Sequence, residues 1–327
     1  MSDVLTVKNL KVYYELPQGV VRAVDDVSFN VREGEILGIA GESGSGKSTL
    51  ALAITGLLRP PAKLVSGTIL FKGVDLTKLS EREWRSIRGR RISIVFQDPN
   101  TYLNPVYTAG FQVAEVFEAH RGGTIASFLR HVIEIFRRVR IADPERRVHS
   151  YPHQLSGGMK QRVLISMAIA EKPDLIVADE PTSALDVTIQ AEIIDLLDEL
   201  RKSLGSSIVF ISHDLALLAE ISDRIMVMYA GKVAEIGDKN TIVSESKHPY
   251  TKALLESINY ERKSRLKAIR GSIPSLINPP RGCRFHPRCP FAMERCSVEE
   301  PRGSIDVKGR IVYCHLYEGG GDGGIKG

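Results

Sequence analysis

The chain has 327 residues, enough for one large or two moderate domains, and its 43% hydrophobic and 25% charged residues are typical of a globular protein. No apolar stretch approaches the ~18–20 residues that a membrane span requires, and the N-terminus lacks the charged-then-apolar layout of a signal peptide. The net charge of +5 is too small to indicate a nucleic-acid partner by itself. We therefore expect a cytoplasmic protein that cannot itself form a channel.

Short patterned segments near the N-terminus predict strands. Segments 5–7 and 27–31 alternate apolar and polar residues around a turn at 33–35, which predicts an antiparallel β region. The apolar run 35–40 then predicts a buried strand, and residues 48–58 predict a helix that ends near two prolines. A strand followed at once by a helix is the context in which phosphate-binding loops occur.

A glycine-rich loop, Gly41-Glu42-Ser43-Gly44-Ser45-Gly46-Lys47-Ser48, joins this strand to this helix and has the form G-x-x-x-x-G-K-S/T. Its glycines let backbone N–H groups turn toward phosphate oxygens at the positive end of the helix. Lys47 adds a positive charge for the β- and γ-phosphates, and the Ser48 hydroxyl is placed to bind Mg²⁺. A chance glycine-rich loop, the alternative, leaves the flanking strand, the helix and the lysine unexplained. The predicted ATP-binding residues of this segment are Gly41, Ser43, Gly44, Ser45, Gly46, Lys47, Ser48 and Thr49.

The middle of the chain changes to a helical pattern. Apolar residues recur at spacings of three and four between 113 and 147, with an interruption at 122–123. This region is expected to form a helical subdomain. Farther on, the apolar stripe over 193–200 predicts an amphipathic helix that packs on the core.

Three further apolar runs, at 92–96, 175–178 and 207–211, predict strands that end in polar side chains. Ligands bind at the carboxyl ends of strands in open α/β sheets. After the second run, Asp179 is suited to orient Mg²⁺ and Glu180 to activate the attacking water as general base.

The other two strand ends carry one candidate residue each. Gln97 follows the first run and can reach metal and water with its amide, and His213 follows the third and can contact the γ-phosphate. A lone glutamine is usually a surface residue and a lone histidine is usually structural. Their order along the chain favours the catalytic interpretation.

A further motif, Leu155-Ser156-Gly157-Gly158-Met159, is not needed by an ordinary phosphate-binding-loop enzyme. Together with the phosphate-binding loop, Gln97, Asp179-Glu180, Ser183-Ala184-Leu185-Asp186 and His213, in this order, it resembles the nucleotide-binding subunit of an ABC transporter. The matching motifs span residues 4 to 235, approximately. The resemblance implies an α/β fold with a RecA-like P-loop NTPase core, an antiparallel β subdomain and a helical subdomain over about 98–160.

The same resemblance assigns roles to residues outside the loop. Tyr14 falls where the family places an aromatic ring on adenine, with Tyr13 beside it as an alternative. Gln97 joins Ser48 and Asp179 as a magnesium ligand. In the family, the signature motif, here residues 155–159, closes on the nucleotide bound by a second ATPase subunit. That second subunit is a paralogue more often than another copy of the same chain. The residues implied in that contact are Ser156, Gly157, Gly158 and Asp186.

The resemblance also implies a contact with a membrane subunit. The proline-bounded segment 98–105 lies between Gln97 and the signature, where the family receives a coupling helix of the permease. Tyr102 and Leu103 are expected to be exposed and to make this contact. The alternative is that both residues cap the core of the helical subdomain.

Three segments narrow the resemblance to the ATPases of oligopeptide and dipeptide importers: 159–163, 248–251 and 282–290. Such a subunit would lie at the cytoplasmic face of the membrane and work with two permease subunits and an extracellular solute-binding protein. Some members of this subfamily serve the import of nickel or oligosaccharides, so these substrates remain alternatives to peptides. An exporter ATPase fits less well, because here the ATPase is a separate chain with a cysteine-containing extension.

Cys283, Cys289, Cys296 and Cys314 are the only cysteines, separated by 5, 6 and 17 residues. A reducing cytosol argues against disulfides, and four thiolates can hold either Zn²⁺ or a [4Fe–4S] cluster. The spacing is not that of paired C-x₂-C zinc modules. The family resemblance favours the iron–sulfur cluster, with zinc or free thiols as alternatives.

We predict an ATPase domain over 1–260, a cysteine-containing extension over 261–318 and a disordered glycine-rich tail over 319–327. Lys and Arg outnumber Asp and Glu between 261 and 314, which indicates either a solvated basic surface or attraction to anionic lipid. The remaining rival class is a soluble ABC ATPase acting on nucleic acid. The chain lacks the long coiled-coil insertion, the second ATPase domain and the interleaved aromatic residues that would favour that class, so we expect no nucleic-acid partner.

Overall fold

The computed structural model describes residues 2–183, 185–258, 269 and 271–318. The chain divides into two compact units, each described by itself. We call Met1–Val4, Val31–Glu35 and Asp75–Ile211 the signature unit, and Leu5–Asn30, Ile36–Val74 and Ser212–Gly327 the loop unit. Among the described residues, no helix has both the length and the apolar character needed to cross a bilayer.

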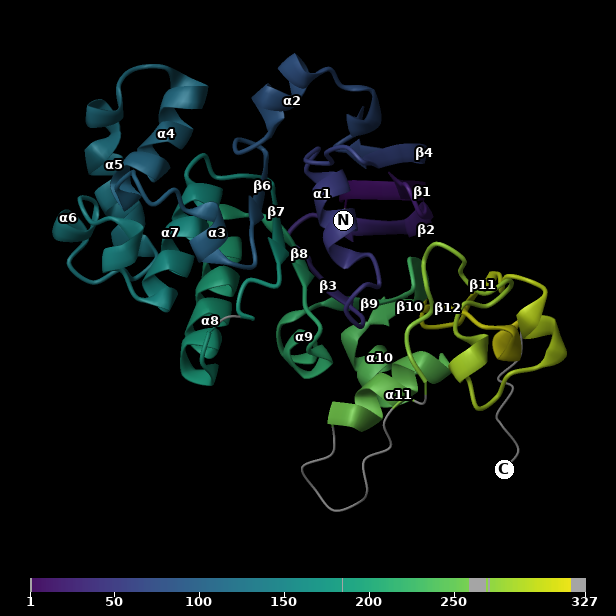
Figure 1. The fold of residues 1–327 in the computed structure, drawn as a ribbon. Coiled ribbons are helices and arrows are strands. Elements are labelled where there is room, and N and C mark those ends of the chain that lie inside the picture. The colour runs from purple at the N-terminus through teal and green to yellow at the C-terminus, as the bar shows by residue number, and fades with distance from the viewer. Residues whose placement is uncertain (1, 184, 259–268, 270, 319–327) are drawn as a thin grey trace. The chain divides into compact units, whose positions relative to one another are not determined.

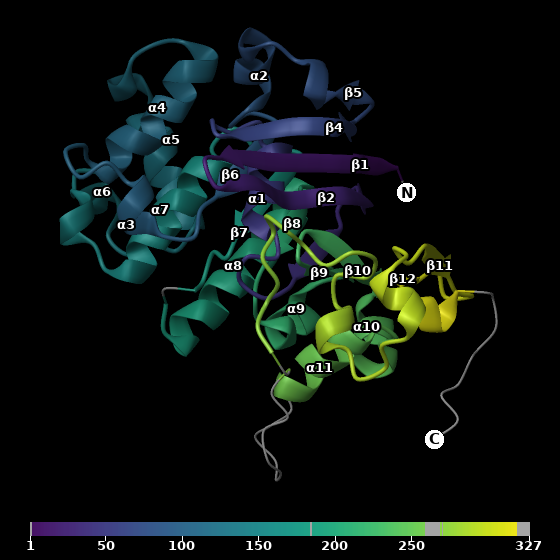
Figure 2. The same cartoon turned by 45° about the vertical axis from the view of Figure 1, so that its right-hand side comes forward.

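The loop unit contains an antiparallel sheet at its N-terminal end. The strand order is β2-β1-β4-β5, and the first three strands lie side by side in both views (Figures 1 and 2). The bounds are β1 (Asp3–Leu16), β2 (Gly19–Arg32), β4 (Ala62–Phe71) and β5 (Val74–Asp75). β1 runs antiparallel to β4, and the inward side chains of β1 and β2 are buried in alternation. The predicted antiparallel β region is confirmed.

A second group of strands in the loop unit carries the phosphate-binding loop. β3 (Ile36–Ala40) is buried at all five positions and runs parallel to β9 (Arg224–Tyr229). β10 (Lys232–Asp238) returns antiparallel to β9. Helices α9 (Leu215–Ile221), α10 (Lys239–Glu245) and α11 (Pro249–Ile258) pack beside these strands. The predicted strand before the loop is therefore confirmed.

Residues 281–318 form a C-terminal module that joins this sheet. Its β12 (Ile311–Tyr313) pairs antiparallel with β10, and β11 (Gly303–Ile305) pairs with β12. Short 3-10 turns make up much of the rest, at His286–Arg288, Glu294–Ser297 and His315–Tyr317. The segment before the module also has a fixed contact, since the Arg22 N–H of β2 donates to the Leu276 carbonyl at 3.0 Å. The predicted domain boundary at 260 and the predicted disordered tail lie outside the described residues.

The helix after the phosphate-binding loop is shorter than expected. α1 spans Lys47–Ile54 and does not continue to residue 58. The Thr55 hydroxyl donates to the Ala51 carbonyl at 2.9 Å, and Gly56 takes a left-handed φ of 65°. A glycine in this conformation commonly ends a helix, so the stop lies before the prolines and not at them.

The signature unit combines a parallel sheet with most of the helices. β6 (Ile92–Val95), β7 (Leu175–Asp179) and β8 (Ser207–Ile211) run parallel in that order, as the three apolar runs predict. The helices are α2 (Glu81–Ile87), α3 (Pro99–Tyr102), α4 (Ala109–Arg121), α5 (Ile125–Arg138), α6 (Pro144–Arg147), α7 (Gly157–Ile169) and α8 (Val187–Leu204). α4 and α5 pack on each other and on α7 (Figure 1), with Phe117 and Phe136 fully enclosed. The predicted helix break at Gly122 is confirmed, because Gly122 caps α4.

Candidate functional site

Two glycines shape the phosphate-binding loop. Gly41 and Gly46 have φ of 153° and 102°, which side chains rarely adopt. A Cβ on Gly41 would lie 2.3 Å from the Met228 carbonyl oxygen, and one on Gly46 would lie 2.1 Å from that of Ala23. The loop therefore needs glycine at these positions because β9 and β2 approach its backbone closely.

Two buried polar residues line this loop. The Lys47 ammonium lies over the loop and donates to the carbonyl oxygens of Gly41 at 2.7 Å and Glu42 at 3.1 Å. The Ser45 hydroxyl is buried and has no hydrogen-bond partner among the described residues. A buried cation at the N-terminus of α1 makes the loop an anion site. Ser48 and Thr49 follow in the first turn of that helix, with Ser48 exposed.

The structure distinguishes between the two candidate tyrosines. The Tyr14 hydroxyl shares a hydrogen bond of 3.1 Å with Thr49 Oγ1, so this ring lies beside α1. Tyr13 instead donates to Asp25 Oδ1 at 2.7 Å, and burial together with this hydrogen bond raises the pKa of Tyr13 to about 12. Of the two, Tyr14 contacts the phosphate-binding segment.

His213 belongs to the same unit as the loop. The Ser212 N–H just before it donates to the Ile39 carbonyl of β3 at 3.1 Å, two residues ahead of Gly41. Asp214 just after it caps α9 by accepting from the Ala216 N–H at 2.9 Å. The exposed His213 is thus fixed between a strand contact and a helix cap.

In the signature unit, Gln97 and Glu180 meet. Gln97 Nε2 donates to Glu180 Oε2 at 3.1 Å, across the ends of β6 and β7. Glu180 has a left-handed φ of 46°, a strained conformation for a residue with a side chain, and its N–H donates to the Ile211 carbonyl at 3.0 Å. Asp179 precedes it as the buried last residue of β7.

The signature motif (155–159) lies at the start of α7, and residues 185–186 lie at the start of α8. These two helix starts are in contact. Ser156 caps α7 by accepting from the Met159 N–H at 3.3 Å, and Asp186 caps α8 by accepting from the Ile189 N–H at 3.0 Å. A Cβ on Gly158 would lie 2.9 Å from Ile189 Cγ2, so the two starts are in contact. Ser156, Gly157 and Asp186 are exposed, whereas Ala184 lies outside the described residues.

Tyr102 and Leu103, the two residues predicted to contact the permease, differ in exposure. Tyr102 is 47% exposed and stacks on Phe96 with ring centroids 3.7 Å apart. Leu103 is only 2% exposed, so the expectation that it is exposed is incorrect. Its N–H donates to the Pro99 carbonyl at 3.1 Å, which closes the short α3 and leaves the side chain in the core. Val106 and Tyr107 are exposed next along the chain.

The four cysteines line one small cavity of ≈ 10 Å³ in the C-terminal module, together with Phe285, Phe291 and His315. Burial raises the pKa of Cys283 to about 11 and that of Cys314 to about 12, with further contributions from the other thiols. A raised pKa favours the neutral thiol over the thiolate in this apolar setting. Among the described residues, no three His, Cys, Asp or Glu side chains are arranged to hold a metal ion.

Sequence reasoning missed two residues that contact the phosphate-binding loop. Arg288 of the C-terminal module forms an ion pair with Glu42, and the Tyr250 hydroxyl accepts from the Glu42 N–H. Both lie in segments that mark the importer subfamily by resemblance. The pairing itself joins residues 246 positions apart, so no local pattern reveals it.

The chain is similar to known proteins along most of its length. The family model described as ABC transporter matches residues 24–183, and the one described as oligopeptide/dipeptide transporter, C-terminal region, matches residues 234–296. The dipeptide transport ATP-binding protein DppD of Escherichia coli is 47% identical over 313 residues, covering 95% of this chain and 96% of the relative. The oligopeptide transport ATP-binding protein AppD of Bacillus subtilis is 42% identical over 97% of this chain and 98% of its own length.

A solved structure agrees with these matches. An ATP-binding cassette described as a dimer in a post-hydrolysis state, bound to ADP and Pi, superposes with a TM-score of 0.64 and 31% identity, covering 72% of this chain and 98% of its own. The fold and the phosphate-binding loop define an ABC-type ATPase. The chain belongs to the ABC transporter family, in the group of dipeptide and oligopeptide transport ATP-binding proteins. The sequence prediction of this family is confirmed.

Proposed function

We propose that this ATPase powers the import of peptides through a separate membrane permease. The observation that carries the proposal is the similarity to dipeptide and oligopeptide transport proteins over nearly the whole chain, including the region 234–296. Oligosaccharides and nickel are the alternative substrates. In this proposal two permease subunits and an extracellular solute-binding protein complete the transporter, and the ATPase lies at the cytoplasmic face of the membrane.

The proposed chemistry begins with the phosphate-binding loop. Lys47 and the loop N–H groups bind the β- and γ-phosphates, Ser48 binds Mg²⁺, and Tyr14 supports the adenine. The buried lysine and the contact between Tyr14 and Thr49 support these roles. The remaining loop residues, Gly41, Ser43, Gly44, Ser45, Gly46 and Thr49, line the phosphates.

Hydrolysis requires a positioned water. In our proposal Asp179 and Gln97 act as Mg²⁺ ligands, Glu180 acts as general base, and His213 contacts the γ-phosphate. The hydrogen bond between Gln97 and Glu180 supports a shared task, because the amide can orient both the carboxylate and a water. The strained backbone at Glu180 is typical of a functional position.

We further propose that the signature motif contacts the nucleotide of a second ATPase subunit. We propose a paralogue as this subunit in preference to a second copy of the chain. Ser156, Gly157, Gly158 and Asp186 would contact the nucleotide of that partner. The exposure of Ser156 and Gly157 at the start of α7 supports this role, since the first N–H groups of a helix attract anions. Tyr102, exposed at the last position of α3, is proposed as a contact with the permease.

We propose a [4Fe–4S] cluster as the ligand of Cys283, Cys289, Cys296 and Cys314, with Zn²⁺ as the weaker candidate. Four thiols around one apolar cavity support the donor set. The cluster would supply a cross-link that pins the C-terminal module. About four irons per chain in protein purified without oxygen would support the cluster, whereas bound zinc without iron would refute it.

The test of the proposed function is uptake by the complete transporter. The ATPase, its permease subunits and its binding protein are reconstituted in vesicles, and labelled dipeptides, oligosaccharides and nickel are compared. We expect ATP-dependent uptake of peptide that is lost with Lys47→Ala. Uptake of nickel or oligosaccharide without peptide would overturn the proposed substrate.

A further inference from the structure

Glu42, the second residue of the phosphate-binding loop, is held by two residues from the C-terminal part of the chain. Arg288 donates to both of its carboxylate oxygens, from Nη1 to Oε2 at 2.7 Å and from Nη2 to Oε1 at 3.2 Å. The fully buried Tyr250 accepts from the Glu42 N–H at 3.0 Å. The loop is thus fixed at both the side chain and the backbone of one residue.

The ion pair is partly shielded from water. The Arg288 side chain is only 6% exposed, and its Nη1 also donates to the Tyr229 hydroxyl at 3.3 Å. Burial works against the charge of Arg288, but the hydrogen bonds to Glu42 and Tyr229 outweigh it and raise its pKa above the ordinary value. A bidentate, charge-assisted pair in such a setting fixes geometry as well as charge.

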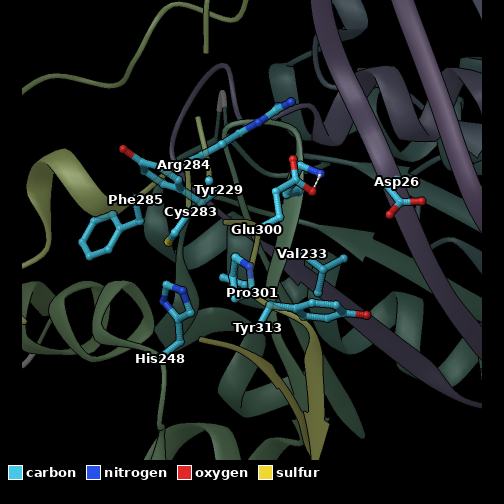
Figure 3. Close-up of a pocket in the computed structure, with 13 residues that line it drawn as sticks. Asp26, Tyr229, Val233, His248, Cys283, Arg284, Phe285, Glu300, Pro301 and Tyr313 are labelled. Atoms are coloured by element: carbon cyan, nitrogen blue, oxygen red, sulfur yellow. Dashed lines mark hydrogen bonds and ion pairs between the residues drawn. The ribbon is translucent and has the colours of Figure 1, made fainter. Parts of the chain in front are cut away.

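An aromatic cluster sets the positions of Tyr250 and the module. Tyr250 packs on Tyr229 and Phe285 with ring centroids 4.6 and 5.4 Å apart, and His248 lies 5.8 Å from Phe285. Figure 3 shows Cys283, Arg284 and Phe285 of the module beside Tyr229 and His248. His248 Nδ1 accepts from the Tyr250 N–H at 3.0 Å, which orients the start of α11.

A second arginine of the module reaches the backbone that supports the loop. Arg284 pairs with Asp25 of β2 and donates to the Ala230 carbonyl. The Asp25 N–H donates to the Gly231 carbonyl at 2.8 Å, and the Gly231 N–H donates to the Ser45 carbonyl at 2.9 Å. A continuous series of contacts therefore runs from Arg284 to the phosphate-binding loop.

We infer that Arg288 and Tyr250 are positioning residues of the phosphate-binding loop, so that the C-terminal module sets how tightly this chain binds nucleotide. The inference rests on the proposed role of the loop in ATP binding. Glu42 places a negative charge in a loop that must hold polyphosphate, and Arg288 neutralises that charge. Without Arg288, the carboxylate repels the phosphates and the loop loses one of its fixed points.

The test uses the full chain and MgADP, which binds without being hydrolysed. Arg288→Ala should weaken MgADP binding roughly tenfold or more in calorimetry, the size of effect expected from losing a charged hydrogen-bonded pair. Glu42→Gln alone should weaken binding less than Arg288→Ala does, because the amide oxygen still accepts from Arg288 and no carboxylate is left to repel phosphate. The double variant with both changes should recover most of the loss, because the repelling charge is gone.

Further variants separate positioning from folding. Arg288→Lys keeps the charge and should bind between wild type and Arg288→Ala. Tyr250→Phe keeps the aromatic packing but removes the acceptor, and it should speed amide hydrogen exchange at 41–46. Lys308→Ala is the control, because it removes another cation of the module, one whose ion pair is with Glu245, and it should leave nucleotide binding unchanged.

The outcomes are distinct. If Arg288→Ala binds MgADP like wild type while Lys47→Ala does not bind, the inference is overturned and the proposed function stands. If the wild type itself fails to bind MgADP, the proposed function falls first. If Arg288→Ala binds MgADP more weakly but the double variant with Glu42→Gln recovers none of that loss, Arg288 acts only in folding and the inference is also overturned.

Discussion

The starts of helices α1 and α7 both follow glycine-containing loops, yet they are built in opposite ways. At α1, Lys47 and Ser45 are buried, and the loop is fixed by β2, by β9 and by the C-terminal module. At α7, Ser156 and Gly157 are exposed, and the cap is the Ser156 side chain of the same turn. The first is a loop held by contacts within its own unit, and the second is a surface that presents its polar groups outward.

This difference has a physical consequence. A loop fixed from several directions spends little conformational entropy when it binds a phosphate, because its backbone is already held in place. An exposed helix start offers the same partial charge but is screened by water until another surface covers it. The two ends are therefore expected to differ in when they act: α1 in the separate subunit, and α7 only after association.

The first prediction compares these two helix starts directly. Lys47→Ala should weaken nucleotide binding to the isolated chain by at least about 100-fold, since it removes the buried cation that faces the phosphates. Ser156→Ala should leave that binding unchanged and should cost only the helix cap, about 1 kcal/mol of stability. Calorimetry with MgADP and thermal unfolding of both variants provide the measurement. Equal loss of nucleotide binding in both variants would erase the distinction between the two starts.

A second prediction compares two neighbours in the signature unit. Leu103→Ala should destabilise the protein by about 2–5 kcal/mol, because it leaves a cavity under α3. Denaturant unfolding of the isolated chain measures this change. A loss below about 1 kcal/mol would mean that Leu103 does not pack as the structure indicates.

Tyr102, the residue before Leu103, should matter for transport and have only a small effect on stability. Tyr102→Ala should change the unfolding free energy little and keep basal ATP hydrolysis, while peptide uptake by the assembled transporter falls. Its ring is half exposed and is available to a permease. Unchanged uptake with Tyr102→Ala would remove this residue from the proposed coupling surface.

The sequence predicts the local parts of the structure well, for physical reasons. The fully buried strands β3, β7 and β8 are continuous apolar runs, and the loop between β3 and α1 needs glycine at defined positions. Gln97 and Glu180 follow different strands, and the hydrogen bond between them shows that the ends of β6 and β7 bring these two side chains together, as expected for neighbouring parallel strands.

What the sequence does not reveal depends on contacts between distant segments. Leu103 looks like an exposed loop residue until α3 closes and turns it inward. The pairing of β12 with β10 and the ion pair of Arg288 with Glu42 join segments that share no periodic signal. Helix α1 ends at Ile54, just before the left-handed Gly56, and not near the prolines where the sequence pattern places its end.

The most direct test asks which bound nucleotide the start of α1 contacts and which one the start of α7 contacts. In the assembled transporter, vanadate traps a photoactivatable ATP analogue after one turnover, and the label on each ATPase subunit is counted separately. We expect Ser156→Ala to reduce trapping on the partner subunit more than on its own chain, and Lys47→Ala to remove the label from its own chain. A Ser156→Ala variant that loses label mainly from its own chain would contradict this expectation.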